Sequence, residues 1–132
     1  MTYNTAQKIK SLYAGREDID HRNSKEAVTQ TIKLLTSGGL GSAWVYTGTT
    51  KSYTTIDGMI ALRPNTKTRI YAIIYVTYGD MYQIDFVQIK NDKAERYCTS
   101  GEVFFEDLAD TYENMYDAYI KAMQNDFIEL RL

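Results

Sequence analysis

The chain has 132 residues, 44% hydrophobic and 24% charged, with a formal charge of −2, which is typical of one soluble globular domain over residues 1–132. A single cysteine, Cys98, and a single histidine, His21, exclude an internal disulfide framework and the usual zinc sites, which need three or four nitrogen or sulfur ligands. Because no apolar run approaches the ~20 residues of a membrane-spanning helix, and the N-terminus lacks the apolar centre of a signal peptide, we expect a cytoplasmic protein without membrane attachment.

A short amphipathic helix is predicted over residues 5–14. Ile9, Leu12 and Tyr13 share one helical face there, and Gly15 follows as a stop.

A second helix is predicted to begin at Asn23. Asn23 and Glu26 have the spacing at which each side chain satisfies the other's backbone N–H. The helix would bury a face that includes Val28 and Leu35, and it would end at the Gly-rich segment 36–42. A helix that leads into such a segment has the wrong order for a phosphate-binding loop, which runs from strand to helix.

From Ser42 onward, β-branched and aromatic residues alternate with a period of two, which is typical of strands. The segments with this pattern are 43–47, 52–56, 59–63, 68–78, 82–90 and 94–99. The short turn-forming separators between them favour antiparallel neighbours. The middle of the chain is therefore predicted to be an antiparallel β-meander of four to six strands.

The register of the turn at Gly79 is expected to pair Tyr78 with Tyr82 across a three-residue loop. This register places Ile74, Val76, Ile84 and Phe86 on one face of the sheet. It places Tyr75, Thr77, Gln83 and Asp85 on the other.

A long amphipathic helix is predicted after Gly101 and is expected to pack on the sheet. Its apolar positions recur every three or four residues: Phe105, Leu108, Tyr112, Met115, Tyr119 and Ala122. Residues 127–132 alternate and would add an edge strand. The predicted fold class is therefore α+β, with two N-terminal helices, the meander and this C-terminal helix.

Acidic residues form a second stripe beside the apolar one: Glu106, Asp110, Glu113 and Asp117. Residues 101–120 contain no lysine or arginine. Carboxylates three or four residues apart on a helix are separated by about 5–6 Å, close to the phosphate spacing of a nucleic-acid strand. Such a face would fit a basic cleft built for nucleic acid, although a solvated helix face has the same pattern.

Tyrosine is unusually frequent, with twelve residues in the chain. Exposed tyrosines beside acids favour recognition of a protein, while a thin core filled with tyrosines has the same composition. The candidate partner-binding residues are Glu106, Asp110, Glu113, Asp117, Tyr71 and Tyr75.

The residues needed for catalysis are scarce. A Ser/His/Asp or Cys/His mechanism would depend on His21, which lies in a charged connector, or on Cys98, which has no activating neighbour in sequence. We therefore expect a protein that is not an enzyme and has neither cofactor nor metal. The sequence pI of about 5.4 and the scattered basic residues disfavour direct binding of nucleic acid.

In size, tyrosine content and acidic helix, the chain resembles the small inhibitory proteins of phages and mobile elements, including anti-CRISPR and DNA-mimic anti-restriction proteins. The resemblance spans the whole chain without a shared motif and assigns no residue a role. It implies an inhibitor of a nucleic-acid-handling enzyme that acts through protein binding.

Two alternatives stay open. One is a small-ligand-binding or enzymatic domain similar to the NTF2-like cones, with an apolar cavity lined by Trp44, Tyr46, Tyr75 and Phe86. The other is a structural subunit that forms homo-oligomers. A filled core with acids and tyrosines outside would favour the protein-binding hypothesis over the cavity.

Overall fold

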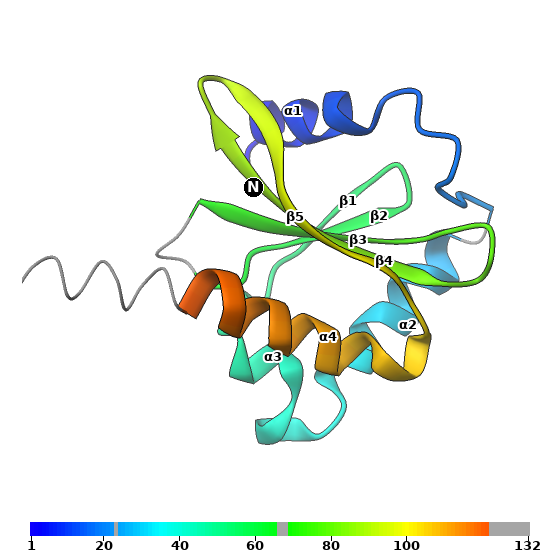
Figure 1. Ribbon diagram of the computed structural model, residues 1–132, viewed down its shortest axis with the longest axis vertical. Helices are drawn as coiled ribbons and strands as arrows, with labels where there is room; N and C mark the ends of the chain where they lie inside the picture. Colours follow the sequence, from blue (N-terminus) through cyan, green and yellow to red (C-terminus); the bar gives the residue numbers. More distant parts are fainter. Residues whose placement is uncertain (23, 66–68, 122–132) are drawn as a thin grey trace, which may run out of the picture.

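The computed structural model describes residues 1–22, 24–65 and 69–121. At its centre is a five-stranded antiparallel sheet whose strands follow one another in chain order, β1-β2-β3-β4-β5 (Figure 1). The strands are β1 (Thr54–Ile56), β2 (Met59–Leu62), β3 (Ile70–Val76), β4 (Tyr82–Lys90) and β5 (Lys93–Val103). The α+β class and the antiparallel sheet predicted from the sequence are confirmed.

Helices cover both faces of this sheet. The helix α1 (Tyr3–Tyr13) lies on one face, and α2 (Ser24–Thr36), α3 (Ala43–Tyr46) and α4 (Leu108–Met115) lie on the other (Figure 1). The 3₁₀ turns η1 (Gly39–Gly41) and η2 (Phe105–Asp107) precede α3 and α4, and the π-helical turn η3 (Tyr116–Lys121) follows α4. No helix of the described ranges is long and apolar enough to cross a membrane.

Each face of the sheet has its own apolar core. Ile84 and Phe86 of β4 point toward α2, α3 and α4, while Ile73 and Tyr75 of β3 point toward α1. Because successive side chains of a strand point to opposite faces, a sheet covered on both sides buries them all. The unbroken apolar run in β3 follows from this arrangement.

The strand predicted over residues 43–47 is wrong, because this segment forms the short helix α3. The side chain of Ser42 is buried and accepts a hydrogen bond from the Val45 N–H at 3.3 Å, which caps the helix start. Thr47 donates its hydroxyl to the Ala43 carbonyl at 2.8 Å, which satisfies the other end. These local bonds outweigh the β-propensity of the residues between them.

The turn between β3 and β4 differs from its predicted register by two residues. Val76, not Tyr78, pairs with Tyr82, so the connecting loop has five residues. Thr77 closes that loop by donating its N–H to the Met81 carbonyl at 2.8 Å. A shift of two preserves the side-chain alternation, so the predicted assignment of residues to the two faces still holds.

The C-terminal helix is less regular than predicted, with a 3₁₀ turn before α4 and a π-helical turn after it. Leu108, Tyr112 and Met115 are buried as expected, but Phe105 is 47% exposed and lies in η2. The π-helical turn then adds one residue per turn, which moves the buried position from Tyr119 to Ile120. Ala122, the predicted strand over 127–132 and the predicted cap at Asn23 lie outside the described residues.

Truncation of Leu108 to alanine is expected to lower the free energy of unfolding by about 2–5 kcal/mol, since the side chain is 0% exposed and its removal leaves a cavity. The exposed Asn114 on the same helix offers a matched control, and Asn114→Ala should change stability by no more than about 0.5 kcal/mol. Urea midpoints measure both effects. Equal midpoints for the two variants would show that α4 does not pack as described.

Candidate functional site

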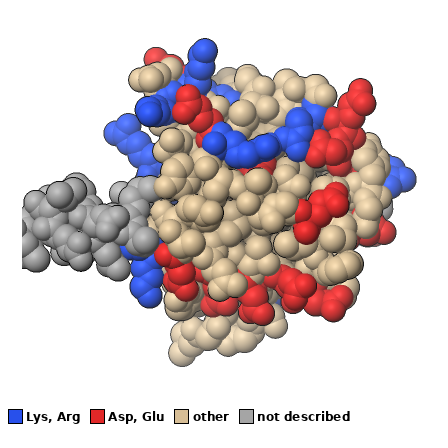
Figure 2. Space-filling view, viewed as in Figure 1, with Lys and Arg blue, Asp and Glu red and all other residues tan. Residues whose placement is uncertain are grey.

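Three acidic side chains form a row along the outer face of α4 and the turn before it. Glu106 and Asp110 are exposed, and Glu113 is half-buried. None of the three has an ion-pair partner among the residues that the structure describes. Figure 2 shows acidic side chains gathered along the side of the molecule where α4 lies, whereas the side of α1 carries lysines and arginines interspersed with further acids.

Asp117, the fourth acid of the predicted stripe, is exposed but bound to its neighbours. Tyr46 of α3 donates its hydroxyl to Asp117 Oδ1 at 2.7 Å, and Lys121 Nζ lies 4.0 Å from the same oxygen. The hydrogen bond to Asp117 raises the pKa of Tyr46. Because its charge is compensated inside the molecule, Asp117 is less available to a partner than the three unpaired acids.

Exposed aromatic side chains lie near both ends of α4. Tyr97 of β5 and Tyr119 of η3 are each 40% exposed, and their rings meet edge to face with centroids 5.8 Å apart. Phe104 and Phe105 are exposed at the N-terminal end of the helix. The sequence placed Tyr119 and Phe105 in the buried stripe, and only the irregular turns at each end of α4 bring them to the surface.

The two tyrosines predicted to join the binding surface lie elsewhere. Tyr75 is 2% exposed, so its prediction as a surface residue is wrong. Tyr71 is half-buried under the guanidinium of Arg63, whose Cζ lies 5.8 Å from the ring centroid. Both side chains point to the α1 face of the sheet, opposite to the acids of α4.

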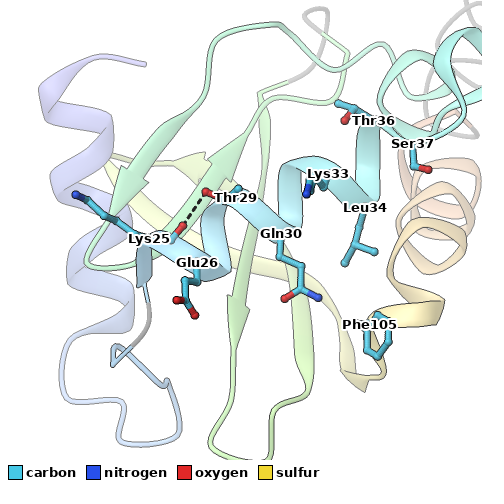
Figure 3. Close-up of a pocket in the computed structure, with 9 residues that line it drawn as sticks. All are labelled: Lys25, Glu26, Thr29, Gln30, Lys33, Leu34, Thr36, Ser37 and Phe105. Atoms are coloured by element: carbon cyan, nitrogen blue, oxygen red, sulfur yellow. Dashed lines mark hydrogen bonds between the residues drawn. The ribbon is translucent and has the colours of Figure 1, made fainter.

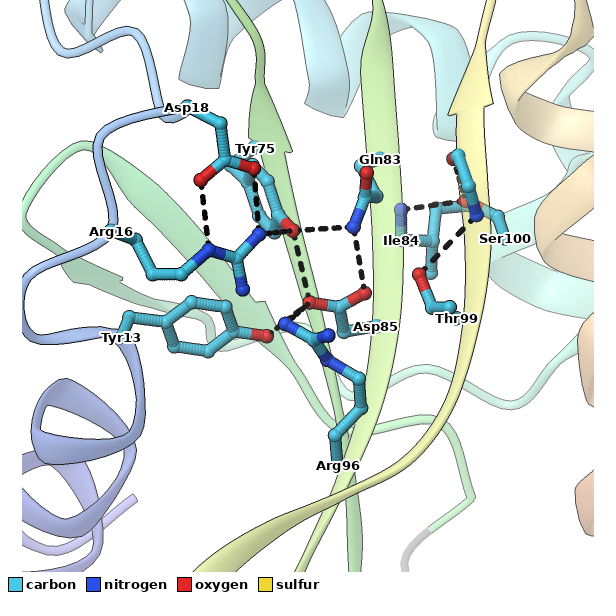
Figure 4. Close-up of polar contacts among 11 residues, drawn as sticks. Tyr13, Arg16, Asp18, Tyr75, Gln83, Ile84, Asp85, Arg96, Thr99 and Ser100 are labelled. Atoms are coloured by element: carbon cyan, nitrogen blue, oxygen red, sulfur yellow. Dashed lines mark hydrogen bonds and ion pairs between the residues drawn. The ribbon is translucent and has the colours of Figure 1, made fainter.

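A buried polar cluster surrounds Asp85, which is 0% exposed in the middle of β4 (Figure 4). Tyr13 and Tyr75 donate their hydroxyls to Asp85 Oδ2 at 2.5 and 3.1 Å. Gln83 Nε2 donates to Oδ1 at 3.3 Å, and Arg96 Nη2 of β5 lies 3.4 Å from Oδ2. The carboxylate therefore links α1 to three adjacent strands.

Arg16 closes the same cluster from the segment after α1. Its guanidinium makes two hydrogen bonds to Asp18, at 2.8 and 2.6 Å, and donates to the Tyr75 hydroxyl at 3.3 Å. The arginines Arg16 and Arg96 balance the carboxylates Asp18 and Asp85 in number. With its charges balanced and its hydroxyls bonded, the cluster is suited to hold α1 on the sheet rather than to bind a ligand.

The single cysteine and the single histidine lie in different surroundings. Cys98 is half-buried, and desolvation raises the pKa of its thiol to about 11, which keeps it protonated at neutral pH. His21 is exposed, with Nδ1 against the Asp57 carbonyl oxygen. Within the described ranges, no group of three or more His, Cys, Asp or Glu side chains could hold a metal ion.

The four residues predicted to line an apolar cavity do not meet around one. Phe86 is 0% exposed and packs edge to face on Tyr112, with ring centroids 6.3 Å apart. Tyr75 points to the opposite face of the sheet, and Tyr46 is 45% exposed. Trp44 packs at the border of the core beneath α2, α3 and α4.

Comparison with protein-family models, with curated proteins and with solved structures found no match.

Proposed function

We propose that this protein is a non-enzymatic interaction module that binds a basic protein surface through α4. The observation that carries the proposal is the row of acids Glu106, Asp110 and Glu113, which have no ion-pair partner in the described part of the chain. Complementary charge steers the encounter of two proteins and sets their orientation. A surface that holds several unpaired acids in one row is suited to a partner with a basic cleft.

The class of partner follows from the spacing of these acids. Positions three or four residues apart on a helix are separated by about 5–6 Å along its axis, which is of the same order as the distance between successive phosphates. A protein that normally binds nucleic acid presents basic groups at this spacing. We therefore propose that the protein inhibits a nucleic-acid-handling enzyme in the cytoplasm, by occupying the cleft that receives the nucleic acid.

The aromatic flank supports a protein as the partner. Tyrosine is enriched in protein interfaces, because its ring buries apolar area while its hydroxyl keeps a hydrogen bond. Tyr97 and Tyr119 offer such area near the C-terminal end of α4, and their mutual ring contact reduces the mobility that binding would have to restrict. The alternative of a ligand-binding cone has less support, because Phe86 is packed inside a filled core.

Neutralising the acidic row is expected to weaken partner binding at least tenfold at low ionic strength, with little effect on folding. The variant combines Glu106→Gln, Asp110→Asn and Glu113→Gln, which keep size and polarity. Exposed charges contribute only about 0–1 kcal/mol to stability, so the variant should unfold at nearly the parent's urea concentration. A matched control carries the same charge change at exposed sites away from α4, namely Glu17→Gln, Asp80→Asn and Glu95→Gln.

The three proteins would be immobilised to capture partners from the source organism. A protein identified by mass spectrometry on the parent and the control would then be purified for affinity measurements at low and moderate salt. The proposal predicts that nucleic acid competes with the parent for this partner and that affinity falls with salt. Equal affinity and equal salt dependence for the neutralised variant and the parent would refute the proposal.

A further inference from the structure

The outer face of α2 borders an open groove of about 820 Å³ (Figure 3). Glu26, Gln30 and Leu34 lie one turn apart along this groove, and Leu34 points toward Phe105 of η2, which forms the opposite wall. Phe105 is 47% exposed. The groove therefore combines an apolar end with a polar helix face.

Three charged side chains line the groove, Lys25, Glu26 and Lys33, and the last two have opposite signs. Glu26 and Lys33 are both exposed, and neither forms an ion pair within the described ranges. They are seven residues apart, about 10.5 Å along the helix axis, which is too far for them to pair with each other. Each charge is therefore free to meet an opposite charge on another molecule.

The positions of these charges are self-complementary. When two copies of α2 pack antiparallel about a two-fold axis between Thr29 and Gln30, Glu26 of each copy faces Lys33 of the other. A two-fold interface uses the same patch on both subunits, so a patch with opposite charges placed symmetrically about its centre matches itself. We propose that a second copy of this chain docks on the outer face of α2 and forms a homodimer with two symmetric Glu26–Lys33 ion pairs.

The apolar end of the groove supplies the anchor of this interface. In the antiparallel arrangement, Leu34 and Phe105 of each copy border the N-terminal end of the other copy's α2, and apolar anchors contribute more to such contacts than rim charges do. Lys25 projects away from Phe105, so its charge stays at the rim (Figure 3). Phe105 adjoins Glu106 of the acidic row, but the Glu26–Lys33 pairs lie on α2, so substitutions at Glu26 and Lys33 test the dimer without changing the acids of α4.

The size of the patch predicts a reversible dimer. A stable interface of standard size buries about 800 Å² on each partner, which is about a tenth of the 7976 Å² surface of this chain. The 13-residue helix α2 is about 20 Å long, so one of its faces together with Phe105 offers less area than this. We therefore expect dimerisation that increases with protein concentration.

Sedimentation velocity of the full chain over a range of concentrations tests the dimer. Lys33→Glu and Glu26→Lys each place like charges opposite one another, and each should weaken self-association at least tenfold. An equimolar mixture of the two variants should associate again, because each carries the charges that the other needs. The double variant Glu26→Lys/Lys33→Glu should dimerise like the parent, and Lys51→Glu, at an exposed site outside the groove, should have no effect.

Phe105→Ser provides an independent readout and should also weaken the dimer at least tenfold, with an unchanged circular dichroism spectrum. Recovery of association in the mixture and in the double variant would support the inference, because loss of folding cannot be reversed by mixing. A parent that stays monomeric at every concentration would overturn it. So would single variants that dimerise like the parent, or a mixture and a double variant that fail to associate.

Discussion

Replacing Asp85 by alanine is expected to lower the free energy of unfolding by about 2–5 kcal/mol. The carboxylate accepts hydrogen bonds from Tyr13 and Tyr75 and pairs with Arg96, and it is 0% exposed. Its loss leaves two buried hydroxyl donors without their acceptor. Because these groups lie between α1 and the sheet, we expect the α1 layer to open before the rest of the fold.

Two further variants separate this effect from a general loss of charge. Asp92 is also an aspartate on the β4–β5 hairpin, but its side chain is 98% exposed and pairs only with Lys8 in the described ranges. Asp92→Asn keeps a side chain that tolerates the positive φ of this position and should therefore change stability by less than about 1 kcal/mol. Asp85→Asn keeps one acceptor oxygen and should destabilise the fold more than Asp92→Asn but less than Asp85→Ala. Urea midpoints and hydrogen exchange of α1 amides measure these differences, and equal stability of Asp85→Ala and Asp92→Asn would contradict the role assigned to the cluster.

The sheet was largely predictable because its signals are local. The strands β1 and β2, and likewise β4 and β5, are joined by short turns of neighbouring residues. Asp57 and Asn91 in these turns have positive φ angles, which aspartate and asparagine tolerate. The bounds of β4 were predicted correctly from alternation alone. The loop after β3 was misjudged by two residues, since alternation with period two cannot distinguish registers that differ by two.

The errors in the helices have a tertiary cause. Residues 43–47 have strand propensity, but the caps at Ser42 and Thr47 and the packing of Ala43 beneath α2 and α4 favour a helix. In the C-terminal helix, a 3–4 repeat assumes uninterrupted α-helical geometry. The π turn of η3 breaks this assumption, and nothing in the apolar pattern distinguishes Tyr119 from Ile120 as the buried residue.

The acidic row of α4 and the Asp85 cluster differ in how far they could be predicted from the sequence. The acids of the row lie close together in the sequence, in α4 and the turn before it, so their spacing could predict a common face. The Asp85 cluster joins Tyr13 to Asp85 across 72 positions of the chain, and such a contact has no local pattern. Its one signal was an aspartate between Ile84 and Phe86 in a strand whose neighbours are apolar, because a buried carboxylate requires partners.

Raising the pH above about 10 is expected to destabilise the fold steeply. Desolvation raises the pKa of Tyr75 and of Tyr112 to about 12. Desolvation and the neighbouring Asp85 also raise the pKa of Tyr13, and burial raises that of Tyr82. In the unfolded chain these hydroxyls ionise near pH 10. Above that pH the unfolded state therefore binds fewer protons than the folded state, and the free energy of unfolding falls as pH rises.

The magnitude follows from the size of the shifts. A shift of two pH units corresponds to about 2.7 kcal/mol, so Tyr75 and Tyr112 together account for a loss of about 5 kcal/mol between pH 10 and 12. This loss is comparable to the whole stability of many domains, about 5–15 kcal/mol. We therefore expect alkaline unfolding within this interval, while the contribution of these tyrosines is kept in full at neutral pH.

Tyr112→Phe isolates one contribution to this slope. At neutral pH the variant loses the hydrogen bond between Tyr112 and Thr49, worth about 1 kcal/mol. Above pH 10 the stability of the variant should fall less steeply than the parent's, by about 1.4 kcal/mol per pH unit. The variant lacks the Tyr112 hydroxyl, which above pH 10 ionises in the unfolded chain but stays protonated in the folded one. Tyr53→Phe, at a side chain that is 45% exposed, should leave the slope unchanged. Urea unfolding at a series of pH values gives the slopes, and parallel curves for Tyr112→Phe and the parent would show that the buried hydroxyl does not govern alkaline stability.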